Sequence, residues 1–129
     1  MRMIYLLFII SLFFISCTKT DNISAKDVSK PIVKIITPVT SEHYNTGEPL
    51  CFKGTADDNG LISSMNLRIE KNGAVIPGLD YNFSPMERSV YLDKKIIVSS
   101  EINGSCTLVF EATDISGNKG SIRFNFSAN

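Results

Sequence analysis

An alternation of apolar and polar residues with a period of two runs through residues 31–127, and it limits the fold more than any other feature. The clearest case is residues 121–127, where Ile122, Phe124 and Phe126 alternate with polar neighbours. Successive side chains of a β-strand point to opposite faces of the sheet, so this spacing predicts half-buried strands. We predict strands at residues 32–36, 50–56, 65–70, 74–83, 89–98, 106–113 and 121–127.

Turn-forming residues separate these segments, and the region lacks the 3.6-residue period of a helix. Asn72-Gly73, Pro77-Gly78 and Asn103-Gly104 are examples. Gly and Asn accept positive φ angles and Pro fixes φ, so these pairs favour tight turns. About seven short strands in some 97 residues are typical of an immunoglobulin-like β-sandwich. We therefore predict an all-β sandwich, with a small β-barrel as the alternative.

Three segments carry a resemblance to a known kind of domain. They are residues 31–38 (PIVKIITP), 54–58 (GTADD) and 112–118 (ATDISGN). In this order they resemble bacterial immunoglobulin-like and cadherin-like domains, and their combination resembles a family of lipoproteins of unknown function in Bacteroidetes-type bacteria. The resemblance implies the fold but no activity, because this sandwich hosts many unrelated functions.

The first sixteen residues have the pattern of an export signal. Arg2 gives one positive charge, and residues 4–15 (IYLLFIISLFFI) are uncharged and mostly apolar. A membrane-spanning helix needs about 20 apolar residues, which is more than this stretch offers. We therefore predict a secretory signal peptide at residues 1–16.

Cys17 follows the apolar stretch directly, and residues 14–17 (FISC) resemble a bacterial lipobox. The resemblance implies that Cys17 is acylated and becomes the first mature residue, which would anchor the protein in a membrane. Thr18 stands where an Asp would favour the inner membrane, and residues 18–22 carry only one acid. We expect an outer-membrane location facing the periplasm; the alternatives are exposure at the cell surface, or ordinary cleavage that leaves a soluble periplasmic protein.

The chain then divides into two parts. Residues 17–30 comprise the lipidated Cys and a polar, aperiodic tether, and residues 31–129 form the sandwich domain. Without residues 1–16 the chain has 113 residues, with 12 basic and 13 acidic side chains. A net charge near −1 provides no excess of positive charge to bind a polyanion, so we expect no nucleic-acid partner.

Two acidic turns are the candidate metal site. In an immunoglobulin-like sandwich the loop between the second and third strands lies at the same end as the loop before the last strand. Here those loops contain the oxygen-bearing residues Asp57, Asp58, Asn59, Asp114 and Asn118. Ca²⁺ prefers six to eight such oxygen ligands. The alternative is that these side chains only cap nearby backbone N–H groups in turns, with no cofactor bound.

The other two cysteines present a second choice. Cys51 and Cys106 fall on predicted strands that antibody-type domains join by a disulfide, and an envelope location permits one. The alternation places Cys106 in the inward phase of its strand and Cys51 in the outward phase, which argues for free thiols. Both interpretations stay open at the level of the sequence.

The function predicted from these features is binding rather than catalysis. The sequence contains no nucleophile elbow, phosphate-cradling glycine motif or HExxH zinc motif. We expect a non-enzymatic envelope lipoprotein whose single domain is a protein-binding or scaffold module, using loops or a free strand edge. The alternatives are a Ca²⁺-dependent carbohydrate-binding or adhesion accessory protein, and an inhibitor or assembly factor for a surface system.

Overall fold

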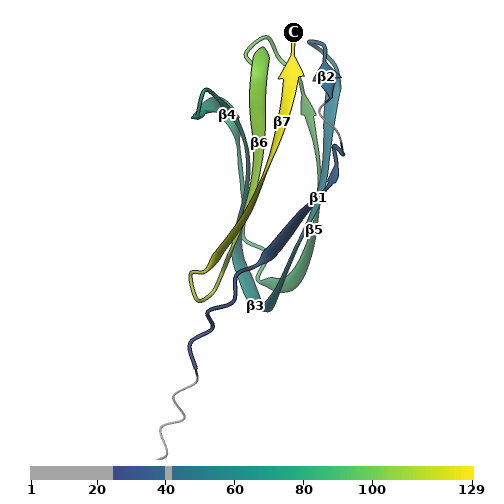
Figure 1. The fold of residues 1–129 in the computed structure, drawn as a ribbon. Helices are drawn as coiled ribbons and strands as arrows, with labels where there is room; N and C mark the ends of the chain where they lie inside the picture. The colour runs from purple at the N-terminus through teal and green to yellow at the C-terminus, as the bar shows by residue number, and fades with distance from the viewer. Residues whose placement is uncertain (1–24, 40–41) are drawn as a thin grey trace, which may run out of the picture.

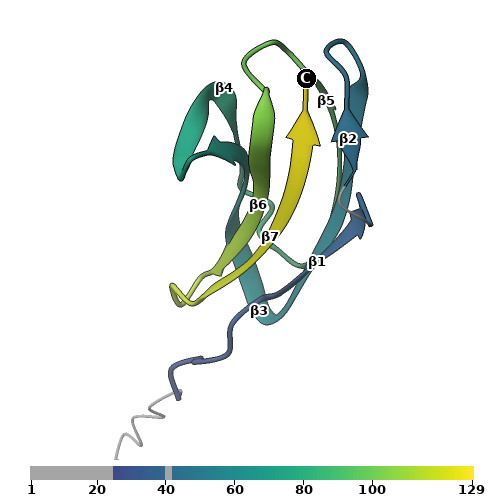
Figure 2. The same cartoon turned by 45° about the horizontal axis from the view of Figure 1, so that its top comes forward.

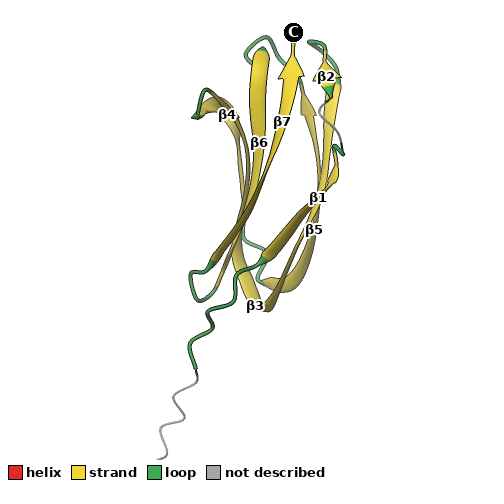
Figure 3. Ribbon diagram, in the orientation of Figure 1, coloured by secondary structure: helices red, strands yellow, loops and turns green. Residues whose placement is uncertain are grey.

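The structure, a computed structural model, describes residues 25–39 and 42–129, and within them it contains strands and no helix (Figure 3). The signal peptide and Cys17 lie outside the described residues. The strands are β1 (Ile32–Thr37), β2 (His43–Tyr44), β3 (Pro49–Lys71), β4 (Ala74–Phe83), β5 (Glu87–Ile97), β6 (Gly104–Asp114) and β7 (Lys119–Ala128). The prediction of an all-β fold with about seven strands is confirmed. No helix of the described part is long and apolar enough to cross a bilayer.

The strands form two layers that face each other (Figures 1 and 2). One layer has the order β1–β3–β5, in which residues 53–57 of β3 pair with β1 and residues 49–57 pair with β5. The other has the order β4–β3–β6–β7–β2, in which residues 65–71 of β3 pair with β4 and residues 62–70 with β6. This arrangement is an immunoglobulin-like sandwich in which β3 belongs to both layers.

The continuity of β3 corrects two sequence predictions. Residues 50–56 and 65–70 are not separate strands, and the loop predicted between them is a bend inside one strand of 23 residues. At the bend the pairing shifts register against β5 between Asp57 and Ile62, and against β6 between Ile62 and Ser64. The turn-favouring residues 58–60 therefore redirect the strand between the layers while the backbone stays extended. The short strand β2 makes up the count of seven.

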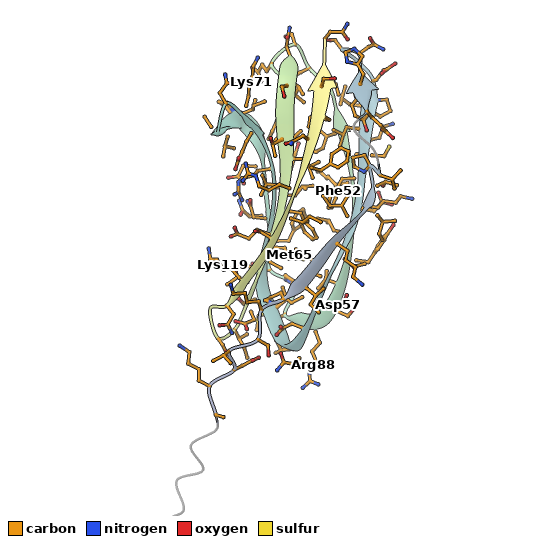
Figure 4. The ribbon with its side chains drawn as sticks, viewed as in Figure 1. Phe52, Asp57, Met65, Lys71, Arg88 and Lys119 are labelled. Carbon is orange, nitrogen blue, oxygen red and sulfur yellow. The ribbon has the colours of Figure 1, made fainter. Side chains whose placement is uncertain are left out.

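The two layers meet in an apolar core. Phe52 on β3 (labelled in Figure 4) and Phe110 on β6 are both fully buried, and their ring centroids lie 5.1 Å apart in an edge-to-face arrangement. Gly54 leaves room for these rings, since a Cβ there would lie 3.2 Å from Phe110 and 2.8 Å from the carbonyl oxygen of Lys34. The Asn72-Gly73 turn joins β3 to β4, with φ angles of 53° and 79° as the sequence predicts for this pair.

The N-terminal end of the domain lies where β3 bends. Ile32 pairs with Asp57, so β1 begins at the bend, beside the turn between β6 and β7 (Figure 1). Pro31 is buried, and its carbonyl oxygen passes so close to Gly120 that a Cβ there would come within 1.9 Å. Residues 25–31 therefore approach the sandwich at the same end as the two acidic segments.

Candidate functional site

Asp114 accepts more hydrogen bonds than the other carboxylates at the acidic end. It ends β6 with a side chain only 2% exposed, and its Oδ1 accepts hydrogen bonds from the backbone N–H groups of Ser116 and Asn118, each at 2.8 Å. The side-chain amide of Asn118 donates to Oδ2 at 2.7 Å. Burial raises the pKa of Asp114, but these hydrogen bonds outweigh it and hold the pKa below the ordinary value. Asp114 is therefore a fixed negative charge.

Two further carboxylates converge on Asp114. Asp58 in the bend of β3 and Asp27 before β1 each bring an oxygen close to it, and the three ligand atoms lie within 4.8 Å of one another. The Oδ2 atom of Asp58 accepts the N–H of Gly60 at 2.8 Å, whereas its buried Oδ1 has no hydrogen-bond partner. The amide of Asn118 also donates to the backbone carbonyl of Asp27 at 2.9 Å.

The structure thus unites part of the predicted metal set. Asp58, Asp114 and Asn118 come together as expected, but Asp57 and Asn59 do not join them. Asp57 turns to the outer face of the β1–β3–β5 layer, where it accepts a hydrogen bond from the hydroxyl of Ser89 on β5, and Asn59 is exposed. Adjacent strand residues point to opposite faces, which separates Asp57 from Asp58.

Asp27 is the residue that sequence reasoning missed. It lies in the polar segment predicted to be a tether, where nothing in the alternation singles it out. The usable signal was indirect: β1 starts at the end where β3 bends, so the chain preceding β1 must pass the acidic segments. The three carboxylates, with backbone carbonyls or water, would be suitable ligands for a hard cation such as Ca²⁺.

A polar groove of about 360 Å³ lies on the outer face of the other layer. Strands β3, β4 and β6 supply most of the residues, and Lys119 contributes from the start of β7 (Figure 4). The lining residues are Ser64, Met65, Asn66, Arg68, Asp80, Asn82, Glu111, Thr113 and Lys119. The list includes two acids and two bases but no aromatic residue. The groove is therefore ionic without a net charge.

Internal hydrogen bonds hold the floor of this groove in place. The amide of Asn66 donates to Asp80 and, at 3.0 Å, to Asn82, both on β4. Its oxygen accepts a hydrogen bond of 2.7 Å from Arg68. On the far side Lys119 pairs with Glu111 at 3.2 Å. A partner would meet donors and acceptors whose positions are already set, which reduces the entropy lost on binding.

An ion-pair network centred on the buried Glu70 continues the groove along β3. Arg68 donates from Nε to Glu70 at 2.8 Å, and Arg123 on β7 donates to the other carboxylate oxygen of Glu70. The Arg68 hydrogen bond is the main cause that holds the pKa of Glu70 below its usual value, although burial opposes it. Val109 pairs with both Arg68 and Arg123 across the sheet and is only 1% exposed, so the network covers an apolar residue on the outer face.

The structure does not join Cys51 to Cys106. Both thiols are free, with Cys51 exposed and Cys106 buried. The reason is the strand phase: Cys51 points outward between the inward-facing Leu50 and Phe52, whereas Cys106 points into the core. Burial raises the pKa of the Cys106 thiol.

Comparisons with known proteins identify the fold. Fibronectin(III)-like modules of Clostridium thermocellum CbhA match with a TM-score of 0.53 and 16% identity, over 75% of this chain and 94% of that chain. OgpA from Akkermansia muciniphila matches with a TM-score of 0.55 and 14% identity, over 78% of this chain and 30% of that chain. No protein-family model and no curated protein matches the sequence. At these identities the likeness shows the fold alone, an immunoglobulin-type sandwich similar to that of fibronectin(III)-like modules.

Proposed function

We propose that this chain is a non-catalytic lipoprotein of the bacterial outer membrane, anchored through Cys17, which binds a protein partner in the polar groove of the β4–β3–β6–β7 layer. The groove is the observation that carries the proposal. It has a volume of about 360 Å³, an internally hydrogen-bonded floor and charges of both signs. Charged groups of both signs favour a polar protein surface, since complementary charges fix register and orientation.

Two features favour a protein over a glycan in this groove. Sugar rings commonly stack on flat aromatic side chains, and none lines the groove. The nearest long strand edge belongs to β4, which among the described strands pairs with β3 alone and could accept an added strand on its other side. An inhibitor or assembly factor would use the same groove, and the identity of the captured partner distinguishes these roles.

The test is crosslinking capture of the lipidated protein from its own membranes. Ser64→Arg fills the groove from an exposed position and should abolish the crosslinked species. Ser100→Arg, in the exposed turn after β5, adds the same side chain elsewhere and should preserve it. Equal capture by both variants would rule out the groove as the binding site. The intact mass of the purified protein reports acylation of Cys17 independently.

A Ca²⁺-dependent carbohydrate or adhesion role is the second candidate. The observation in its favour is the convergence of Asp27, Asp58 and Asp114, together with the buried Asp58 oxygen that lacks a hydrogen bond. Calorimetric titration of the mature protein with Ca²⁺ tests it. Binding heat that disappears in Asp58→Asn supports the candidate, and no heat at millimolar Ca²⁺ eliminates it.

A further inference from the structure

The outer face of the β1–β3–β5 layer exposes large apolar side chains on its two outer strands. Ile32 and Ile36 on β1 are 62% and 45% exposed, and Tyr91 and Ile97 on β5 are 56% and 54% exposed. They are not displaced core residues, because their strand neighbours Val33, Ile35, Val90 and Leu92 already pack against the core. A single exposed apolar residue needs no explanation, but several on one sheet face indicate a contact surface.

Basic side chains are interleaved with these apolar residues. On β1, Lys34 lies between the exposed Ile32 and Ile36, and on β5 Lys95 precedes Ile97 by two residues. Neither lysine forms an ion pair within residues 25–39 and 42–129. Two aspartates share the face, but Asp93 pairs with Lys53 at 3.7 Å and Asp57 accepts the hydroxyl of Ser89. We call Ile32, Lys34, Ile36, Tyr91, Lys95 and Ile97 the β1–β5 face.

The start of the chain brings this face close to a membrane. Residues 25–31 contact the sandwich through Asp27 and Pro31, so nine residues (18–26) separate the predicted lipid on Cys17 from the first contact with the domain. Nine residues span at most about 32 Å even when fully extended. β5 has 11 residues and is about 36 Å long, so the reach is shorter than the sandwich. The chain enters the domain at β1, one border of the β1–β5 face.

We propose that the β1–β5 face lies against the surface of the anionic bilayer that holds the lipid anchor. Isoleucine side chains and the tyrosine ring enter the headgroup boundary, and each lysine extends its ammonium group to lipid phosphates. The polar groove, on the outer face of the other layer, then points away from the membrane. The inference rests on the proposed lipid anchoring, but it concerns a different surface from the groove.

Cys51 supplies a direct probe, since it is exposed on the outer face of β3, opposite Lys95. The mature lipoprotein is reconstituted in vesicles of neutral and anionic phospholipid, and Cys51 is labelled with an environment-sensitive fluorophore. Cys106 is buried, and acylation blocks Cys17. We expect nitroxide lipids to quench the label. The matched control carries Cys51→Ser with Ser64→Cys in the groove, and its label should not be quenched.

Charge reversal tests the lysines. Lys34→Glu and Lys95→Glu should each weaken the docking that quenching reports by more than about fivefold, because losing one basic group near an anionic surface costs about that much and the new carboxylate is also repelled. Lys119→Glu, beside the groove, should leave quenching unchanged. Equal quenching of the labels at Cys51 and at position 64 overturns the proposal, and so does the absence of quenching at Cys51 in an acylated chain. Neither result contradicts the lipid anchor. The proposal is also overturned if light scattering shows a dimer and Cys51 is not accessible to the label in that dimer. If the intact mass shows no acylation, the proposed lipid anchor is refuted. Sedimentation of the same chain with anionic vesicles then tests whether the β1–β5 face binds a membrane: cosedimentation supports the proposal, and its absence overturns it.

Discussion

Asp58→Asn should stabilise the protein in the absence of Ca²⁺, although it alters a partly buried polar residue. Asp58 faces Asp27 with ligand oxygens no more than 4.8 Å apart, and no Lys or Arg of the described part forms an ion pair with either. Two unit charges at that separation repel by about 0.9 kcal/mol in water and about 3.5 kcal/mol at an effective dielectric constant of 20.

The asparagine removes this repulsion and keeps the local structure. Its oxygen accepts the N–H of Gly60 as the carboxylate does, and its amide can donate to a neighbouring carboxylate. We expect the free energy of unfolding to rise by about 1 kcal/mol. This value is close to the repulsion in water, because Asp58 is partly exposed. For a domain of this size the gain corresponds to roughly 4–8 °C in Tm.

Thermal unfolding followed by circular dichroism measures this effect, in chelator and in about 5 mM CaCl₂. In chelator the variant should unfold at the higher temperature, and added salt should reduce the difference by screening. If Ca²⁺ binds with a Kd of about 0.5 mM, it stabilises the original protein by about 1.4 kcal/mol and the variant much less. Asp57→Asn is the control, since Asp57 lies outside the cluster. A variant less stable than the original protein in chelator at low salt would refute the repulsion.

Three further predictions concern stability. Phe52→Ala should cost about 3–5 kcal/mol in urea unfolding because it opens a cavity in the core, whereas Tyr91→Ala, at an exposed site, should cost less than about 1 kcal/mol. Gly120→Ala should cost about 1–3 kcal/mol and speed amide exchange in β1, because its Cβ would meet the carbonyl of Pro31; unchanged exchange would contradict that contact. Glu70→Gln should cost about 2 kcal/mol at pH 7. Because the folded pKa of Glu70 is lowered, its stabilisation is present above about pH 4.3 and is lost as the pH falls through the folded pKa, so the cost should shrink in acid denaturation series.

The sequence predicted most of the fold because alternation reports burial directly. Residues 121–127 and 106–113 match β7 and β6 closely, since each has one face in the core. β2 has two residues, too few for any period. The continuity of β3 could not be read because Asp58-Asn59-Gly60 favours a turn, and only the pairing with β5 and then β6 keeps the strand extended.

The candidate sites were harder to predict from the sequence, because they depend on the register between neighbouring strands. Asn66 and Arg68 are visible in the sequence as outward positions, but the neighbours that turn them into a groove come from β4 and β6. Asp27 joins the acidic cluster only through the path of the chain before β1. Side-chain phase is local information, whereas the strand that lies next to another is decided by the whole fold.

The antiparallel pairing of β1 with β3 also determines how the domain bears load. If the N-terminus is held in a membrane while a partner pulls on the opposite layer, tension enters at Ile32 and runs along the axis of β1 (Figure 1). The five residue pairs between β1 and β3 are then sheared together instead of being peeled one at a time. Since β3 continues into the other layer, the force passes through covalent backbone from one sheet to the next, and we expect the anchored domain to resist extension until that short strand detaches.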